Sequence, residues 1–98
     1  MEAGLSVARQ FGENLCRERK RADLSQEEVG FRASLHRTEI GLVERGERLV
    51  RLDTAIKLSG AAGVPLGELI AGIEWSPGFA RRGRFEAAEG GGEADGGP

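Results

Sequence analysis

The chain has 98 residues, of which 39% are hydrophobic and 5% aromatic, and its net charge is −2. This length holds one small domain with a modest aliphatic core, which excludes a multidomain enzyme. Without a long apolar run or the apolar core of a signal peptide, the sequence predicts no membrane span, and we expect a cytoplasmic protein. A single cysteine, Cys16, excludes an internal disulfide and a multi-cysteine metal site.

Charge is distributed unevenly along the chain. All 14 lysines and arginines lie at or before Arg84, and four of the 16 carboxylates follow it, so residues 1–85 carry 14 positive and 12 negative charges. An acidic tail therefore masks a slightly basic body. The segment 86–98 contains no Val, Ile, Leu, Phe or Trp. It cannot bury enough apolar surface to become ordered, and we predict disorder from about residue 86.

Two helices are predicted near the start of the chain. Apolar residues recur every four positions at Val7, Phe11 and Leu15, which predicts an amphipathic helix from about Ser6 to Ala22. Ser25 and Glu28 then have the spacing of a capping box, in which each side chain accepts a hydrogen bond from the other residue's backbone N–H. A second, short helix should therefore begin at Ser25 and end before Ser34.

Three more helical segments follow, and no strand is predicted. One runs from about Arg37 to Arg45 with Gly46 at its C-terminal end, and another from about Leu52 to Ala62 with Gly63 as its stop. The inward residues of the latter are expected to be Leu52, Ala55, Ile56 and Ser59. A fifth apolar stripe comprises Leu66, Leu69, Ile70 and Ile73, and it ends before the helix-breaking run Trp75-Ser76-Pro77-Gly78.

Two of these segments resemble a known family. The runs Leu24-Ser25-Gln26-Glu27-Glu28-Val29-Gly30 and Leu35-His36-Arg37-Thr38-Glu39-Ile40-Gly41-Leu42-Val43-Glu44-Arg45-Gly46 are similar to the Cro/cI repressor-type helix-turn-helix family, also called the Xre family. The resemblance extends from about Phe11 to Ile73. His-Arg-Thr at the head of the third helix is most like the controller proteins of restriction–modification systems. The expected fold is thus an all-α, five-helix repressor-like bundle containing a helix-turn-helix, with a disordered C-terminal tail.

A helix of this width fits the major groove of DNA, and the third helix is the candidate reader. Burying Ile40 and Val43 turns the opposite face outward, with Arg37, Thr38, Gly41, Leu42 and Arg45. We predict base contacts by Arg37 to guanine, by Thr38 to a base edge or phosphate, and by Leu42 to a thymine methyl group. Predicted contacts to the DNA backbone are those of Gln26, Arg45, Arg48 and Arg51.

For the remaining polar residues in this region, structural roles are favoured. By the resemblance, Arg19 and Glu44 form a buried salt bridge that joins the first and third helices. Glu39 either accepts a hydrogen bond from cytosine N4 or folds back as the capping partner of His36, and we favour capping. His36 itself caps its helix or packs in the turn.

One domain and an extension are predicted: residues 6–75 as the helix-turn-helix DNA-binding domain and residues 76–98 as a C-terminal extension. One reading helix gains specificity mainly by dimerisation, since a dimer binds two half-sites. The predicted dimer interface consists of Leu66, Leu69, Ile70, Ile73 and Trp75. The stretch Arg81–Phe85 is either a basic arm that touches phosphates or a solvated tail, and we favour the tail.

Taken together, the pattern predicts a sequence-specific transcriptional regulator that binds double-stranded DNA, as a homodimeric repressor or autoregulator. The alternative is an antitoxin-like protein whose C-terminal extension binds a partner protein. An enzyme is disfavoured, because one His and one Cys on short helices build no catalytic set. We expect no cofactor, no metal and no membrane partner.

Overall fold

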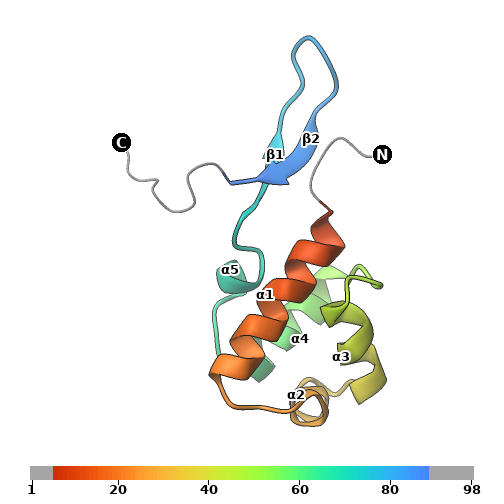
Figure 1. Ribbon diagram of the computed structural model, residues 1–98, viewed down its shortest axis with the longest axis vertical. Helices are drawn as coiled ribbons and strands as arrows, with labels where there is room; N and C mark the ends of the chain where they lie inside the picture. Colours follow the sequence, from red (N-terminus) through yellow and green to blue (C-terminus); the bar gives the residue numbers. More distant parts are fainter. Residues whose placement is uncertain (1–5, 89–98) are drawn as a thin grey trace.

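The computed structural model describes residues 6–88, which form five helices followed by a two-stranded antiparallel hairpin (Figure 1). The helices are α1 (Val7–Arg21), α2 (Gln26–Ala33), α3 (Arg37–Glu44), α4 (Leu52–Ala62) and α5 (Leu66–Leu69). The strands are β1 (Ile73–Ser76) and β2 (Arg84–Ala87). None of the helices in this described part of the chain is long and apolar enough to cross a membrane.

The helix ends lie close to where the sequence predicts them, because local signals set them. Ser6 is the N-cap of α1, and its hydroxyl accepts a hydrogen bond from the backbone N–H of Arg9. The capping box at the start of α2 is present in full, with Glu28 N to Ser25 Oγ at 3.0 Å and Ser25 N to Glu28 Oε1 at 2.7 Å. Gly63 ends α4 in the left-handed conformation.

The capping box makes the stability of the protein depend on pH. The backbone and hydroxyl of Ser25 hold the pKa of Glu28 below its ordinary value. A lowered pKa means that the Glu28 carboxylate stabilises the fold above its ordinary pKa, and this contribution is lost as the pH falls through the lowered value. We therefore expect the wild type to be more stable than Glu28→Gln at neutral pH and the difference to shrink as the pH falls through the lowered pKa of Glu28.

Urea denaturation across this pH range measures the effect. Glu27→Gln removes a carboxylate from the same turn without touching the capping box, and it controls for the loss of charge. A stability difference between wild type and Glu28→Gln that stays constant with pH would show that the ionised carboxylate contributes nothing to the helix.

The hydrophobic core lies between α1 and the four shorter helices. It comprises Phe11, Leu15, Val29, Ala33, Ile40, Val43, Ala55, Leu58, Ala61 and Leu69. Every helix contributes at least one of these side chains, so α2 and α3 are held by tertiary packing, as helices of eight residues require. The core thus fixes the helix-turn-helix as a rigid unit on α1 and α4.

A buried polar side chain joins the two ends of the helical region. Asn14 of α1 is 1% exposed, and its Nδ2 donates to the carbonyl oxygens of Leu69 and Ala71, each at 2.9 Å. Its Oδ1 accepts from Gln10 Nε2 at 3.0 Å and from Arg17 Nη1 at 2.9 Å. These bonds satisfy the amide fully and hold the end of α5 against α1. Nothing in the apolar spacing indicated this residue.

Helix α4 presents a different face to the core from the one predicted. Ala55 and Ser59 are buried as expected, but the large apolar core residue is Leu58, whereas Leu52 is 70% and Ile56 53% exposed. The prediction for Leu52 and Ile56 was wrong because Ala55, Leu58 and Ala62 form a competing stripe at the same helical spacing.

The chain beyond α5 departs most from the sequence prediction. Helix α5 ends at Leu69, and after Gly72 at φ +84° the predicted helical stripe becomes β1. The expectation of no strand was therefore wrong. Glu86 and Ala87, which were predicted to begin the disordered tail, lie in β2. Ala88 follows β2, and its N–H donates to the carbonyl of Gly72 at 3.0 Å. Residues 89–98 of that predicted tail lie outside the described residues.

Candidate nucleic-acid interface

The turn between α2 and α3 holds the two helices in a fixed relation. Ser34 ends α2 in the left-handed conformation with φ 60°, and the N–H of Leu35 donates to the carbonyl of Gly30 at 2.8 Å. His36 is the N-cap of α3, and its Nδ1 accepts a hydrogen bond from the N–H of Thr38 at 3.0 Å. Both predicted roles for this turn, a tight connection and a capping histidine, are present.

Helix α3 buries one face and exposes its first turn. Ile40 and Val43 are fully buried, as predicted, while Arg37 and Thr38 are exposed. Leu42 is only partly exposed. The first turn of α3 is consequently the part of the helix that a duplex can reach most easily.

Gly41 is not on the exposed face of α3, where the helical pattern placed it. It is buried, and a methyl group added to it would lie 3.2 Å from Arg45 Nη1 and 3.6 Å from Gln26 Oε1. The side chains of Gln26 from α2 and Arg45 from the end of α3 therefore converge over this glycine. The amide of Gln26 also donates to Glu44 Oε1 at 3.0 Å. Gln26, which was predicted to bind a phosphate, is thus already hydrogen-bonded within the protein.

Every arginine that the sequence assigned to DNA forms an ion pair with a nearby carboxylate. Arg37 Nη1 lies 3.7 Å from Glu27, Arg45 Nε 3.2 Å from Glu47, and Arg51 Nη2 3.2 Å from Asp53. Arg48 Nη1 is 3.0 Å from both carboxylate oxygens of Glu39. Exposed pairs of this kind contribute little free energy, so phosphates can displace the carboxylates.

The contact with Arg48 overturns the favoured role of Glu39. Its carboxylate was expected to fold back on the start of α3, but it turns instead to Arg48 in the α3–α4 loop. In a capping box this carboxylate would accept from the N–H of His36. Both of its oxygens instead lie 3.0 Å from Arg48 Nη1, in a contact where donor and acceptor are both charged. Glu39 therefore holds the loop that carries Arg48.

Arg19 and Glu44 are brought together as the resemblance implied. Arg19 Nε lies 2.6 Å from Glu44 Oε2, and Arg19 Nη2 lies 3.1 Å from Glu44 Oε1, while the side chains are only 13% and 6% exposed. Hydrogen bonding to Glu44 raises the pKa of Arg19. The two parallel bonds tie α1 to the C-terminal end of α3 and so orient the candidate reading helix.

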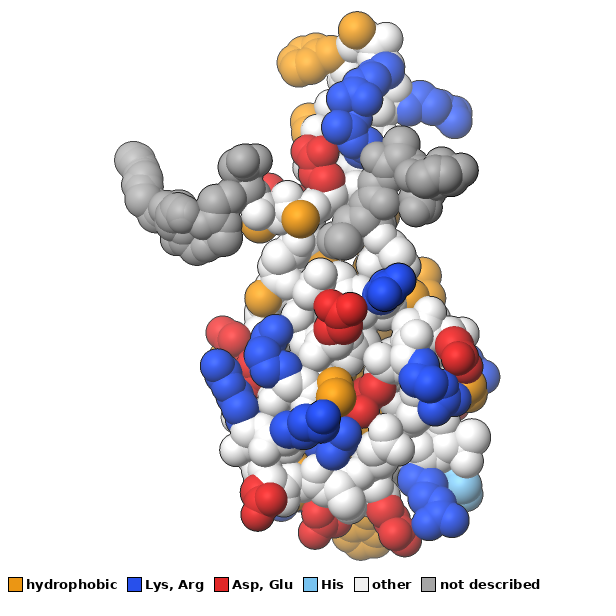
Figure 2. Space-filling model, in the orientation of Figure 1, with side chains coloured by type: hydrophobic (Ala, Val, Ile, Leu, Met, Phe, Trp, Pro, Cys, Tyr) orange, Lys and Arg blue, Asp and Glu red, His pale blue; other side chains and the backbone are white. Residues whose placement is uncertain are grey.

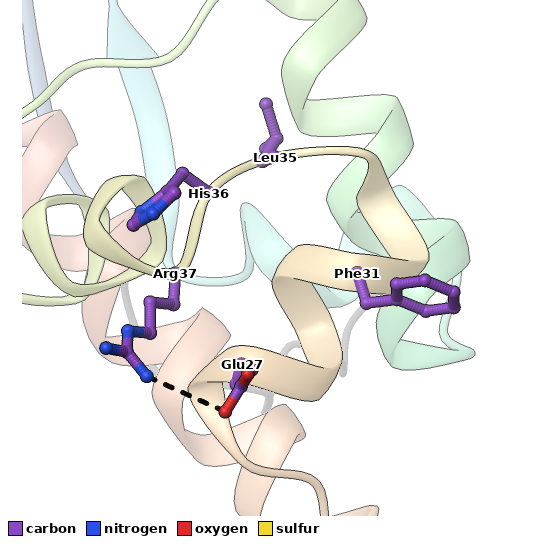
Figure 3. Close-up of a pocket in the computed structure, with 5 residues that line it drawn as sticks. All are labelled: Glu27, Phe31, Leu35, His36 and Arg37. Carbon is purple, nitrogen blue, oxygen red and sulfur yellow. Dashed lines mark ion pairs between the residues drawn. The ribbon is translucent and has the colours of Figure 1, made fainter.

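A hollow of about 380 Å³ opens between α2 and the start of α3 (Figure 3). Its lining residues are Glu27, Phe31, Leu35, His36 and Arg37. In Figure 3 the guanidinium of Arg37 points towards Glu27, and the ring of Phe31 points away from the other four side chains. Phe31 is 86% exposed, which the apolar pattern did not indicate.

The predicted dimer interface divides into buried and exposed residues. Leu69 is fully buried in the core, so it presents no surface to a partner, and Leu66 and Ile73 pack partly against the core. Ile70 and Trp75 remain 45% and 56% exposed. Three further exposed apolar side chains lie on or just before α4, at Leu49, Leu52 and Ile56.

A capped short helix, a tight turn and a second short helix with an exposed, polar first turn define a helix-turn-helix protein. The helix-turn-helix family model matches residues 17–69, so the chain belongs to this Cro/cI-type (Xre) family, a family of DNA-binding transcription regulators and not of enzymes. The resemblance drawn from the sequence is thus confirmed.

The chain is similar to a control protein, to a restriction–modification controller and to a transcription factor. The control protein C.BamHI of Bacillus amyloliquefaciens is 44% identical over 50 residues, which are 51% of this chain and 62% of that protein. The match thus spans less than two thirds of that relative. The crystal structure of the restriction–modification controller C.AhdI from Aeromonas hydrophila is 37% identical, with a TM-score of 0.63 over 66% of this chain and 98% of that one. The transcription factor NHTF from Neisseria, described as hypothetical, is 26% identical, with a TM-score of 0.63 over 71% and 83%.

Proposed function

We propose that the protein is a homodimeric, sequence-specific regulator of transcription that inserts α3 into the major groove of double-stranded DNA. The observation that carries this proposal is the exposed first turn of α3, where Arg37 and Thr38 stand on a helix held by buried Ile40 and Val43. A rigid element that presents a few polar side chains is what base reading requires.

The residues of the interface have separate tasks. Arg37 donates two hydrogen bonds to guanine O6 and N7, and Thr38 bonds a neighbouring base edge or phosphate. Leu42, which is partly buried, contacts a thymine methyl group. The residues that bind the DNA backbone and set its affinity and salt dependence are Gln26, Arg45, Arg48 and Arg51.

When these arginines bind DNA, they must exchange the carboxylates that now pair with them for phosphates or bases. Glu27, Glu39, Glu47 and Asp53 each release an arginine to a phosphate or a base. Because exposed pairs of this kind contribute little free energy, the exchange lowers the affinity for any duplex only slightly. Discrimination between sequences therefore rests on the base contacts of α3.

Dimerisation places two copies of α3 about 34 Å apart on one face of the duplex. Exposed apolar side chains of the helical body available for this contact are Leu49, Leu52, Ile56 and Ile70. The homodimer acts as a repressor or autoregulator by occupying DNA at or near a promoter, as the kinship with controller proteins supports.

Selection of binding sites from a random duplex pool tests the proposal, and we expect a two-fold symmetric motif. On the selected site Arg37→Ala should cost about 1–3 kcal/mol, roughly a 5- to 150-fold loss of affinity, and should relax one base position. Arg48→Ala is the comparison, because it should weaken binding to all sequences alike and lower the salt slope by about 1.

Two results would contradict this assignment. An equal loss on every sequence from Arg37→Ala would remove Arg37 as a base reader. A pool that shows no enrichment with the wild type would remove sequence-specific binding altogether.

A further inference from the structure

The hairpin of residues 73–87, called the arm below, stands out from the helical body (Figure 1). Its strands pair in antiparallel register, with Ile73 opposite Ala87 and Trp75 opposite Phe85. The rings of Trp75 and Phe85 meet edge to face, with centroids 5.1 Å apart. The family match ends at residue 69, before β1, so the arm is an addition to the helix-turn-helix domain.

The loop at the end of the arm, residues 77–83, is closely packed on itself. A methyl group on Gly83 would lie 2.5 Å from Cζ2 of Trp75 and 2.7 Å from the carbonyl oxygen of Ser76. One on Gly78 would collide with the carbonyl oxygen of Arg81 and lie 2.7 Å from the N of Gly83. Such close approaches define a specific turn, so the favoured reading of this stretch as a solvated tail is replaced by a structured hairpin.

The arm separates its charges along its length. Glu74 and Glu86 face each other in the strands, where Glu86 pairs with Arg84 at 3.2 Å. Arg81 and Arg82 lie in the exposed loop, and within residues 6–88 neither has an ion-pair partner. All four arginines around α3, by contrast, are paired. Figure 2 shows the basic side chains gathered at the far end of the arm.

An apolar side chain accompanies these two arginines. Phe79, in the same loop, is 96% exposed, more than any other large hydrophobic residue described. The ring of Phe79 does not contribute to the packing of the loop, which is closed by Trp75 and the two glycines. Arginines beside an exposed apolar wedge are the combination that proteins use on the DNA minor groove.

We propose that the arm is a second DNA-binding element, whose Arg81 and Arg82 contact phosphates and whose Phe79 enters the minor groove of the DNA that flanks the segment read by α3. The charge of the loop is complementary to the duplex, and a two-stranded hairpin that is marginally stable alone gains support from the contact. This inference rests on the proposed function, since α3 must bring the duplex to the protein.

The sole tryptophan of the chain, Trp75, lies within the arm and reports on it directly. We would titrate the full-length protein with a short duplex that holds only the selected motif, and with a duplex extended by about one helical turn on each side. The expected result is a change in Trp75 fluorescence and a steeper dependence of affinity on salt with the extended duplex alone.

Variants of the loop make the assignment specific. The double substitution Arg81→Ala/Arg82→Ala should lower the salt slope on the extended duplex by about 1.8, because two phosphate contacts are lost. Arg81→Lys/Arg82→Lys should retain the slope, and Lys20→Ala, which removes an exposed charge from α1, should leave the advantage of the extended duplex unchanged. Phe79→Ala should reduce that advantage without altering the slope.

The outcomes separate this inference from the proposed function. If wild type and Arg81→Ala/Arg82→Ala gain equally from the extended duplex, the arm does not bind DNA, whereas the selected motif and the effect of Arg37→Ala stand. If no motif is selected but the loop variant still lowers the salt slope on random duplex, the arm binds DNA and the reading role of α3 fails. A Trp75 response to an acidic polypeptide and none to duplex would overturn the inference in favour of a protein partner.

Discussion

Arg19→Met should lower the free energy of unfolding by about 3–5 kcal/mol, the range expected when one partner of a buried ion pair is removed. The side chain of Glu44 is 6% exposed in the wild type. Within residues 6–88 the substitution leaves the amide of Gln26 as the one side chain that donates to its carboxylate. Because the pKa of Arg19 is raised, its stabilisation is present below its ordinary pKa and is lost only above the raised value. The measurement can therefore be made at neutral pH, where both partners are charged.

Two variants distinguish burial of the pair from a general effect of charge. Arg9→Met removes the exposed pair of Arg9 with Glu13, also on α1, and should cost at most about 1 kcal/mol. The double variant Arg19→Met/Glu44→Leu removes both buried charges and should recover most of the loss. Similar small losses from Arg9→Met and Arg19→Met in urea denaturation would show that the Arg19–Glu44 pair does not hold α3 on α1.

Gly12→Ala should destabilise the protein by about 3 kcal/mol, at the upper end of overpacking effects. A methyl group at this position of α1 would collide with the carbonyl oxygen of Val43 and lie 2.8 Å from that of Glu44. Both atoms belong to the backbone of α3, and no rotamer change can move them aside. The two helices must therefore separate, which displaces the candidate reading helix from the body that orients it.

Gly60→Ala is the matched control, because Gly60 also lies in a helix but the added methyl group would have no atom within 4 Å outside the adjacent backbone of its own helix. It should raise the free energy of unfolding by up to about 1 kcal/mol through helix propensity. Thermal or urea unfolding of both variants measures the two changes in the free energy of unfolding. If Gly12→Ala gains stability as Gly60→Ala does, α1 and α3 are not in the close contact that the structure shows.

The opposite expectations for Gly12 and Gly60 could not be derived from the sequence. Both are glycines within predicted helices, and a helical pattern assigns each the same small cost of backbone entropy. Only the approach of α3 to α1 makes one of them irreplaceable. The same holds for Asn14, whose bonds to the carbonyls of Leu69 and Ala71 join residues more than 50 positions apart.

The sequence by itself determined the features that depend on neighbouring residues. The capping box of Ser25 and Glu28, the cap by His36, the left-handed end at Gly63 and the outward first turn of α3 all follow from spacings of a few positions. The helix-turn-helix could be recognised for the same reason, since its two helices and turn occupy one continuous segment.

The tertiary structure decided the features that depend on distant or competing contacts. In α4 it is Leu58, and not Leu52 or Ile56, that faces the core. Two apolar faces of this helix are similar in the sequence, and only the face with Leu58 packs against the other helices. The tertiary structure also pairs the carboxylate of Glu39 with Arg48. It forms a hairpin from residues 73–87, although the sequences of its four-residue strands hardly indicate a strand. Pairing between strands and between charges is set by which segments the fold brings together, and apolar periodicity does not record it.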